Sequence, residues 1–403
     1  MPPRTSWLGV SAALLVGVVA AGYVGKLPPA LPALKAEFAL SLVAAGWVVS
    51  TFNTIALATA VAFGLAADRI GAFRIALAGL ALLVVGGVGG AAAPSGAWLI
   101  VSRVVEGAGL LAVTVAGTAL IFSATAPGDR KLALGIWSTY MPFGMAIAMA
   151  AAPPVIDAIG WRGLWLAIAL ATIASGAALA SQRRSYPSAP ASGRSFRAIL
   201  AALGQPGPWW NSLVMTFYTL QWSGVMVWLP TFLVQTRGAS LTAASLIAAV
   251  VVAVNVPGNL TGAWLMQRQA PRGLVVCAAA VLMGAFGIGI FAEGAPDWMR
   301  LGSCLAFSYF SGVIPAVAFA APQTYARSQS QVASLQGLMM QGSNLGQFVG
   351  PPAIAAAVSA GGRWGDAVYV MVAAAALTLV CGLAVARDER RLRDERRLPT
   401  RTA

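Results

Sequence analysis

Three charged side chains lie inside long apolar stretches of the sequence, where charge is rare. Lys26 lies two-thirds of the way along the first stretch, and Arg103 and Glu106 share a later one. The spacing of three residues places Arg103 and Glu106 on one face of a helix, where opposite charges partly neutralise each other. A carboxylate in a low-dielectric environment can exchange protons near physiological pH. We therefore expect Glu106 to take part in proton coupling or in substrate binding.

Each of these charges also has a structural explanation. Arg103 and Glu106 could form an ion pair that only stabilises the protein, and the ammonium of Lys26 could reach the outer membrane interface. Lys35 and Glu37 lie about ten residues farther along and mark that interface better. The residues alone leave both interpretations open.

Uncharged polar side chains recur in the other apolar stretches. Any one of them could form a hydrogen bond between helices. Together they are too many for that role alone, so we expect about half of them to line a pathway for a solute. The candidates are Asn53, Tyr140, Gln221, Trp222, Asn255, Asn259, Tyr309, Gln341 and Asn344.

The overall composition indicates which class of protein positions these side chains. Of the 403 residues, 59% are hydrophobic and 9% are charged, whereas soluble domains carry about 25% charged residues. This excludes an ordinary cytosolic enzyme, a nucleic-acid-binding domain and a disordered scaffold. Histidine is absent and the three cysteines are isolated, which removes the usual metal sites and the Ser-His and Cys-His forms of catalysis. We expect no enzyme activity, no metal and no cofactor.

Apolar stretches bounded by charge, proline or glycine predict an all-α membrane protein with twelve transmembrane helices. Backbone polar groups in lipid must be satisfied internally, and these stretches are too long to be strands of a barrel. The predicted spans are residues 7–34, 42–66, 75–92, 98–123, 132–156, 164–181, 209–235, 241–266, 273–292, 299–325, 332–358 and 367–386.

The chain divides near its midpoint. A segment rich in Ser, Arg, Pro and Gly, 183–207, separates an N-terminal six-helix bundle (1–182) from a C-terminal one (208–386). Most of the 26 basic residues fall in the connections on the side of the N-terminus, so the positive-inside rule places both termini in the cytoplasm, with the protein in the plasma (inner) membrane. The charged cytoplasmic tail, 387–403, is expected to form a short solvated helix.

The two halves resemble each other. Gly144 is followed nine residues later by Pro153-Pro154, and Gly342 is followed nine residues later by Pro351-Pro352, with an offset of 198 residues between the two motifs. An outer glycine follows each Pro-Pro pair, Gly160 in the first half and Gly362 in the second. Such an offset indicates a duplicated six-helix unit, which is a transporter architecture.

The loop between the second and third spans reads Gly64-Leu-Ala-Ala-Asp68-Arg69-Ile-Gly71-Ala-Phe-Arg74. It resembles the GxLxDRxGRR signature of the major facilitator superfamily, with departures at Ala66 and Ala72-Phe73. The resemblance covers essentially the whole chain and implies two pseudo-symmetric six-helix bundles. It also implies that this loop gates the transporter, through Gly64, Asp68, Arg69, Gly71 and Arg74.

Two further stretches are similar to motifs of the same superfamily. The fourth span reads Arg103-Val-Val-Glu106-Gly107-Ala-Gly109, which resembles RxxxGxG. The seventh span contains Gln221-Trp222, followed shortly by a Trp-Leu-Pro sequence, and this stretch is similar to one in the cyanate and nitroimidazole permease-like branch. In superfamily members the first and fourth spans border a central cavity. The resemblance therefore implies that Lys26, Arg103 and Glu106 share a water-filled site.

Together these features favour a secondary active transporter that works by alternating access. The three charges sum to +1 when Glu106 is ionised, which favours symport of a small organic anion with protons.

Multidrug efflux by drug/proton antiport is the alternative. Met141, Met145 and Met149 recur every four residues, and thioethers bind Cu(I), although methionine also fills gaps in helix packing. The expected partners are a small-molecule substrate, protons and membrane lipid, with no nucleic acid, and a monomer is expected.

Overall fold

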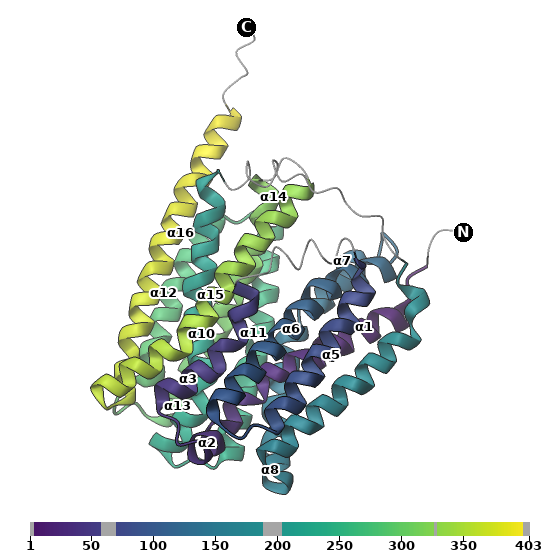
Figure 1. Cartoon of the computed structure of the whole chain (residues 1–403). Helices are drawn as coiled ribbons and strands as arrows, with labels where there is room; N and C mark the ends of the chain where they lie inside the picture. Colours follow the sequence, from purple (N-terminus) through teal and green to yellow (C-terminus); the bar gives the residue numbers. More distant parts are fainter. Residues whose placement is uncertain (1–3, 58–69, 188–203, 326–328, 398–403) are drawn as a thin grey trace. The chain divides into compact units, whose positions relative to one another are not determined.

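The computed structural model describes residues 4–57, 70–187, 204–325 and 329–397, which are helical apart from short connections (Figure 1). The helices of the first half are α1 (Trp7–Gly25), α2 (Leu27–Glu37), α3 (Leu42–Ser50), α5 (Ala72–Ala91), α6 (Gly96–Ala124), α7 (Arg130–Trp137) and α8 (Tyr140–Ser181). Those of the second half are α10 (Pro206–Arg237), α11 (Leu241–Gln267), α12 (Arg272–Phe291), α13 (Asp297–Ala320), α14 (Pro322–Tyr325), α15 (Gln329–Gly361) and α16 (Ala367–Arg397). Short 3-10 helices are η1 (Thr51–Asn53), η2 (Arg183–Ser185) and η3 (Trp364–Asp366).

The predicted all-α membrane architecture is confirmed. Among the described residues, 8 helical stretches are long and apolar enough to cross a membrane, and Leu42–Leu57 is a shorter apolar one. One of the eight, Leu132–Ser181, contains two predicted spans, because Gly160 has a φ of +72° and breaks the helix between them. The two other predicted spans coincide with α10 and α15. Each of the twelve predicted spans thus overlaps helical residues, and residues 58–66 of the second span lie outside the described part of the chain.

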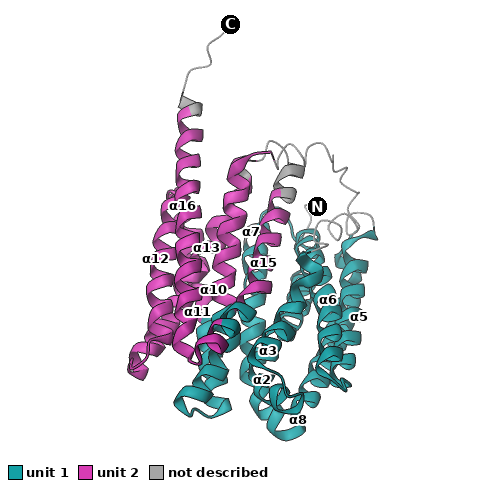
Figure 2. Ribbon diagram, turned by 60° about the vertical axis from the view of Figure 1, so that its left-hand side comes forward, with its two compact units in different colours: residues 1–193, 224–253, 351–356 teal, residues 194–223, 254–350, 357–403 magenta. Residues whose placement is uncertain are grey.

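The chain forms two compact units, coloured separately in Figure 2. The first contains residues 1–193, 224–253 and 351–356, and the second contains residues 194–223, 254–350 and 357–403. Most of the predicted linker lies outside the described residues. The boundaries of the two predicted bundles therefore stay a prediction.

The connections between helices carry the internal repeat. Gly71, which precedes α5, has a φ of +94°, and Gln269, which lies 198 residues later and shortly before α12, has a φ of +58°. Side chains other than glycine rarely adopt this left-handed region. Both halves thus have a residue with positive φ at this position, a glycine in the first half and a glutamine in the second. The outer glycines Gly160 and Gly362 also correspond, with φ values of +72° and +74°.

Matched glycines allow close helix packing in each half. A β-carbon at Gly144 of α8 would overlap the carbonyl oxygen of Val18 in α1. A β-carbon at Gly342 of α15 would overlap the carbonyl oxygen of Ser212 in α10. Small residues let helix backbones approach in membranes, so the two positions of the sequence repeat have the same packing role.

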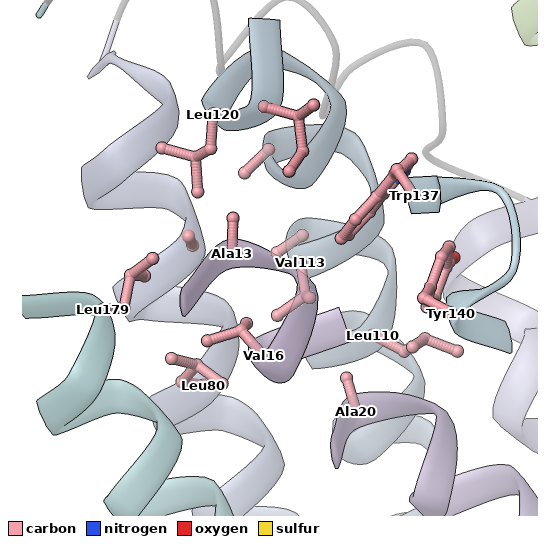
Figure 3. Packing of buried hydrophobic residues seen from close by; sticks show 14 of the residues in the cluster. Ala13, Val16, Ala20, Leu80, Leu110, Val113, Leu120, Trp137, Tyr140 and Leu179 are labelled. Atoms are coloured by element: carbon pink, nitrogen blue, oxygen red, sulfur yellow. The ribbon is translucent and has the colours of Figure 1, made fainter. Parts of the chain in front are cut away.

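The core of the first unit joins α1 to its neighbours. Figure 3 shows Ala13 and Val16 of α1 packed near Val113 of α6. Trp137 closes one side of the cluster, where its ring stacks on Tyr140 with centroids 4.4 Å apart. This packing fixes α1 against α6, the two helices that carry the candidate charges.

The charged tail is a continuation of α16 as far as Arg397, rather than a separate short helix. Glu389 is buried and accepts a hydrogen bond from Arg272 at 2.5 Å, and Tyr325 donates to Asp388 at 2.7 Å. The expectation that this segment is solvated is therefore wrong at Glu389, because its carboxylate neutralises a buried arginine of the second unit.

Candidate functional site

Lys26 lies at a break between the two helices of the first span. α1 ends at Gly25 and α2 begins at Leu27. Pro28 and Pro29 have no N–H groups and cannot continue the hydrogen bonds of α1, but proline is well tolerated in the first turn of a new helix. The local sequence therefore interrupts the helix next to its charged side chain.

Helix α6 carries the other two charges. Its N-terminus is capped by Ser95, whose hydroxyl accepts a hydrogen bond from the N–H of Trp98 at 3.3 Å. About two turns farther along, the guanidinium of Arg103 donates to the carboxylate of Glu106. The predicted i,i+3 pair is present.

The carboxylate of Glu106 contacts both cations. Lys26 Nζ lies 2.7 Å from Glu106 Oε1, while Arg103 contacts Oε2. Arg103 also donates to the backbone carbonyl of Tyr23 at 3.0 Å and so reaches the last turn of α1. The structure thus brings together the three charges that the sequence singled out, and we call Lys26, Arg103 and Glu106 the triad.

The triad is buried in the first unit. The exposed fractions of Lys26, Arg103 and Glu106 are 0%, 1% and 0%. Its surroundings therefore differ from the water-filled site that the family resemblance implied. Taking a charge out of water costs several kcal/mol per ion unless it is paired. The pairing with Glu106 offsets this cost for only one positive charge, and a surplus of one remains when all three groups are ionised.

Aromatic rings surround this surplus charge. Lys26 Nζ lies 4.2 Å from the ring centroids of both Tyr23 and Trp165, and the Arg103 guanidinium lies 4.3 Å from that of Phe52. The negative face of an aromatic ring attracts a cation, more strongly where water is excluded. The rings therefore help to hold two cations beside one carboxylate.

Trp165 and two glycines of α5 that lie beside it or beside Glu106 were not among the predicted site residues. A β-carbon at Gly90 of α5 would lie 2.7 Å from Trp165 Nε1, and one at Gly86 would lie 2.7 Å from Glu106 Cγ. Two glycines four residues apart form one face of a helix and permit close approach. The spacing of Gly86 and Gly90 in the third predicted span could therefore have predicted that another helix packs closely against this face.

The other candidates of the first unit have protein partners or partial exposure. The hydroxyls of Tyr140 and Thr114 lie 3.1 Å apart, and the ring of Tyr140 belongs to the core. Asn53 lies in η1 and is half-buried. Met145 and Met149 are buried in α8, and the described residues contain no group of three or more His, Cys, Asp and Glu that could hold a metal.

In the second unit, the asparagines form a network between α11 and α13. Asn255 Nδ2 donates to Ser311 Oγ at 3.0 Å, and Asn259 Nδ2 donates to Asn255 Oδ1 at 2.7 Å. The hydroxyls of Tyr309 and Thr261 lie 2.7 Å apart. These contacts satisfy the side chains without a ligand, in agreement with the structural explanation.

Four buried polar atoms of α10 have no hydrogen-bond partner among the described residues, namely Gln221 Oε1, Trp222 Nε1, Ser223 Oγ and Thr231 Oγ1. Gln221 is 0% exposed, and the side chain of Trp222 is half-buried as a whole. In α15, Gln341 is half-buried and Asn344 is buried. Because buried polar atoms are nearly always hydrogen-bonded, these atoms of α10 are among those that a bound solute or water could satisfy.

The predicted gate is described only in part. Gly64, Asp68 and Arg69 lie outside the described residues. Gly71 is in the left-handed conformation expected for its tight turn, and Arg74 is exposed in the first turn of α5.

Comparison with known proteins identifies the class. Residues 12–341 match the family model described as Major Facilitator Superfamily. The fold is similar to that of a bacterial homologue of the human lysosomal transporter Spinster, in an inward-facing and unoccupied conformation. The TM-score is 0.80 at 17% identity, over 99% of this chain and 100% of that one. The chain belongs to the Major Facilitator Superfamily and is a multi-pass membrane transporter.

Individual relatives differ in what they are named for. The chain is 25% identical to the putative niacin/nicotinamide transporter NiaP of Bacillus subtilis, over 70% of this chain and 72% of that protein. It is 25% identical to the 2-nitroimidazole transporter of Escherichia coli, over 80% and 81%. The match to the multidrug resistance protein Stp of Mycobacterium tuberculosis is 29% identical and covers 34% of this chain but only 26% of Stp.

Proposed function

We propose that this transporter moves a small organic anion together with a proton by alternating access. The observation that carries the proposal is the buried triad, in which Lys26 and Arg103 share the carboxylate of Glu106. A buried surplus of positive charge is costly, and an anion that reaches it relieves that cost. Intramembrane ionisable residues commonly mark substrate and proton pathways.

Charge balance would couple the two ligands. Glu106 Oε1 lies 2.7 Å from Lys26 Nζ and uses one of the three N–H groups of the ammonium, so an anion could bind beside it. The anion alone would bring the net charge of the triad from +1 to zero, whereas a proton alone would raise it to +2. Without the anion, a proton on Glu106 would leave Lys26 and Arg103 together with no ionised carboxylate. Each ligand therefore makes binding of the other more favourable, as thermodynamic coupling requires.

The remaining assignments follow from the same hypothesis. We infer that Gln221 and Trp222 contact the solute, because their buried polar atoms lack protein partners among the described residues. The segment from Gly64 to Arg74 would gate the pathway. The protein would lie in the inner membrane as a monomer. The distribution of basic residues favours a cytoplasmic position for both termini.

The relatives support a small solute and leave one alternative. The niacin/nicotinamide and 2-nitroimidazole transporters align over most of their length and are named for small heteroaromatic compounds. The multidrug proteins Stp and LfrA favour drug/proton antiport as the alternative, over 26% and 33% of their length. A cationic drug would need an available carboxylate, whereas Glu106 already contacts two cations.

The test measures uptake of radiolabelled niacin, benzoate and acetate into proteoliposomes, with an acidic or a neutral outer buffer and protein-free liposomes as the blank. Uptake is measured rather than current, because one monovalent anion and one proton carry no net charge together. We expect protein-dependent uptake of at least one anion that grows with outside acid. Lys26→Met should abolish it. Arg162→Met, which removes a cation from an exposed ion pair with Glu37, should not. Transport of lipophilic cations, with none of any anion, would instead establish the antiporter.

A further inference from the structure

We propose a second anion-binding site, separate from the triad, where the end of the first span meets α10. A cavity of about 230 Å³ within the first unit is lined by Pro32, Lys35, Thr231, Val234 and Gln235. Pockets for drug-sized ligands have volumes of about 300–1,000 Å³. The cavity therefore suits a smaller solute.

Lys35 supplies the positive charge of this site. It is half-buried in the last turn of α2, and within the described ranges no carboxylate oxygen lies within 4.0 Å of its ammonium. Glu37, two residues farther along, is already bound by Arg162 at 2.6 Å and by Trp161 at 2.7 Å. An anion entering the cavity would meet a cation without a competing carboxylate.

Thr231 supplies a hydroxyl that is not used within its helix. Threonine in a helix commonly donates to the carbonyl four residues earlier. Several threonines of this chain do so at 2.7–3.0 Å, namely Thr216, Thr219, Thr236, Thr261 and Thr378. Thr231 is only 2% exposed, yet its Oγ1 has no partner among the described residues. A buried hydroxyl without a protein partner is available to a ligand that enters the cavity.

The lining indicates the chemical class of the ligand. An ammonium and a hydroxyl bind a carboxylate group, and the side chains of Pro32 and Val234 provide apolar wall beside them. We assign the site to a small carboxylate with a short apolar part. Its role, which rests on the proposed function, would be to capture the transported anion before it reaches the triad.

The first experiment titrates benzoate into the purified full chain in detergent and measures heat. We expect Lys35→Gln to weaken benzoate binding about tenfold, because a hydrogen bond from a charged donor is stronger than one from a neutral donor. Thr231→Val removes a neutral hydroxyl and should weaken binding about threefold. Lys35→Arg keeps the charge and should bind nearly as wild type. Thr236→Val is the matched control on the same helix, because Thr236 bonds the carbonyl of Phe232 at 2.7 Å.

A second comparison distinguishes this site from the triad and from the transport hypothesis. Benzoate binding that is lost in Lys26→Met but unchanged in Lys35→Gln and Thr231→Val would overturn the proposed site, as would absence of binding in wild type. If wild type binds benzoate through Lys35 and Thr231 but takes up no anion into proteoliposomes, the site stands and the proposed function fails. If anion uptake persists while Lys35→Gln and Thr231→Val bind as wild type does, the function stands and the site fails.

Discussion

The triad predicts that two neutralising substitutions will have unequal effects on stability. Glu106→Gln leaves Lys26 and Arg103 buried together without a carboxylate. Lys26→Met leaves Arg103 and Glu106 as a neutral buried pair. The methionine side chain would fill the space that the apolar stem of Lys26 occupies. We therefore expect Glu106→Gln to destabilise the protein much more than Lys26→Met.

The geometry sets the size of this difference. At 2.7 Å and an effective dielectric constant of about 20, one pair of unit charges attracts by about 6 kcal/mol before desolvation is counted. Removing one partner of a buried pair costs about 3–5 kcal/mol in net stability. Lys26→Met conserves most of the volume and removes the desolvation cost of the ammonium, so its net effect should stay within about 1.5 kcal/mol.

Thermal unfolding in detergent, followed by tryptophan fluorescence, measures the difference. Glu106→Gln should lower the melting temperature by several degrees, and the double variant K26M/E106Q should recover part of that loss because only one buried cation remains. Glu37→Gln is the matched control, since the ion pair of Glu37 with Arg162 is exposed and such pairs contribute about 0–1 kcal/mol. If Lys26→Met destabilises the protein as much as Glu106→Gln does, our description of the triad as one carboxylate shared by two cations is wrong.

Two further predictions concern packing and pH. A β-carbon at Gly107 would overlap the carbonyl oxygen of Phe52. Gly107→Ala should therefore lower the free energy of unfolding by about 1–3 kcal/mol through overpacking. Gly135→Ala, with open space around the β-carbon, is the control and should be neutral or slightly stabilising in the same melting assay. Burial raises the pKa of Tyr186 to about 12 from its ordinary value of 10.0. The stabilising contribution of the neutral phenol is therefore complete below pH 10.0 and is lost as the pH rises through about 12. Across that pH range the melting temperature should fall in wild type, and it should fall less in Tyr186→Phe.

The spans could be predicted from sequence because lipid imposes simple rules on length and polarity. Twenty apolar residues between charges can only be a helix there, and the Pro-Pro and glycine motifs revealed the repeat. The same uniform hydrophobicity hides which face of a helix meets which neighbour. The contact of Lys26 with the ring of Trp165 depends on how α8 is rotated about its axis. The sequence of α8 has no polar stripe from which that rotation could be predicted.

The site was predictable in its residue types and not in its surroundings. The spacing of Arg103 and Glu106 fixed their pairing, since three residues separate them on one helix. Lys26 is 80 residues from Glu106, so their contact needed the packing of α1 against α6. The cavity beside Lys35 was equally hidden, because Thr231 looks in sequence like any other helical threonine.

The triad also connects charge to backbone geometry. Arg103 donates both to Glu106 and to the carbonyl of Tyr23, in the last turn of α1. Immediately beyond it, Pro28 and Pro29 remove the N–H groups that would bond carbonyls four residues earlier. Bending here breaks fewer hydrogen bonds than bending elsewhere in the span. A proton on Glu106 would weaken its attraction for Arg103, which also binds the last turn of α1. We expect the first span to bend in response at the interruption between α1 and α2. An unbroken first span with the same three charges could bind a proton but would have no such flexible point.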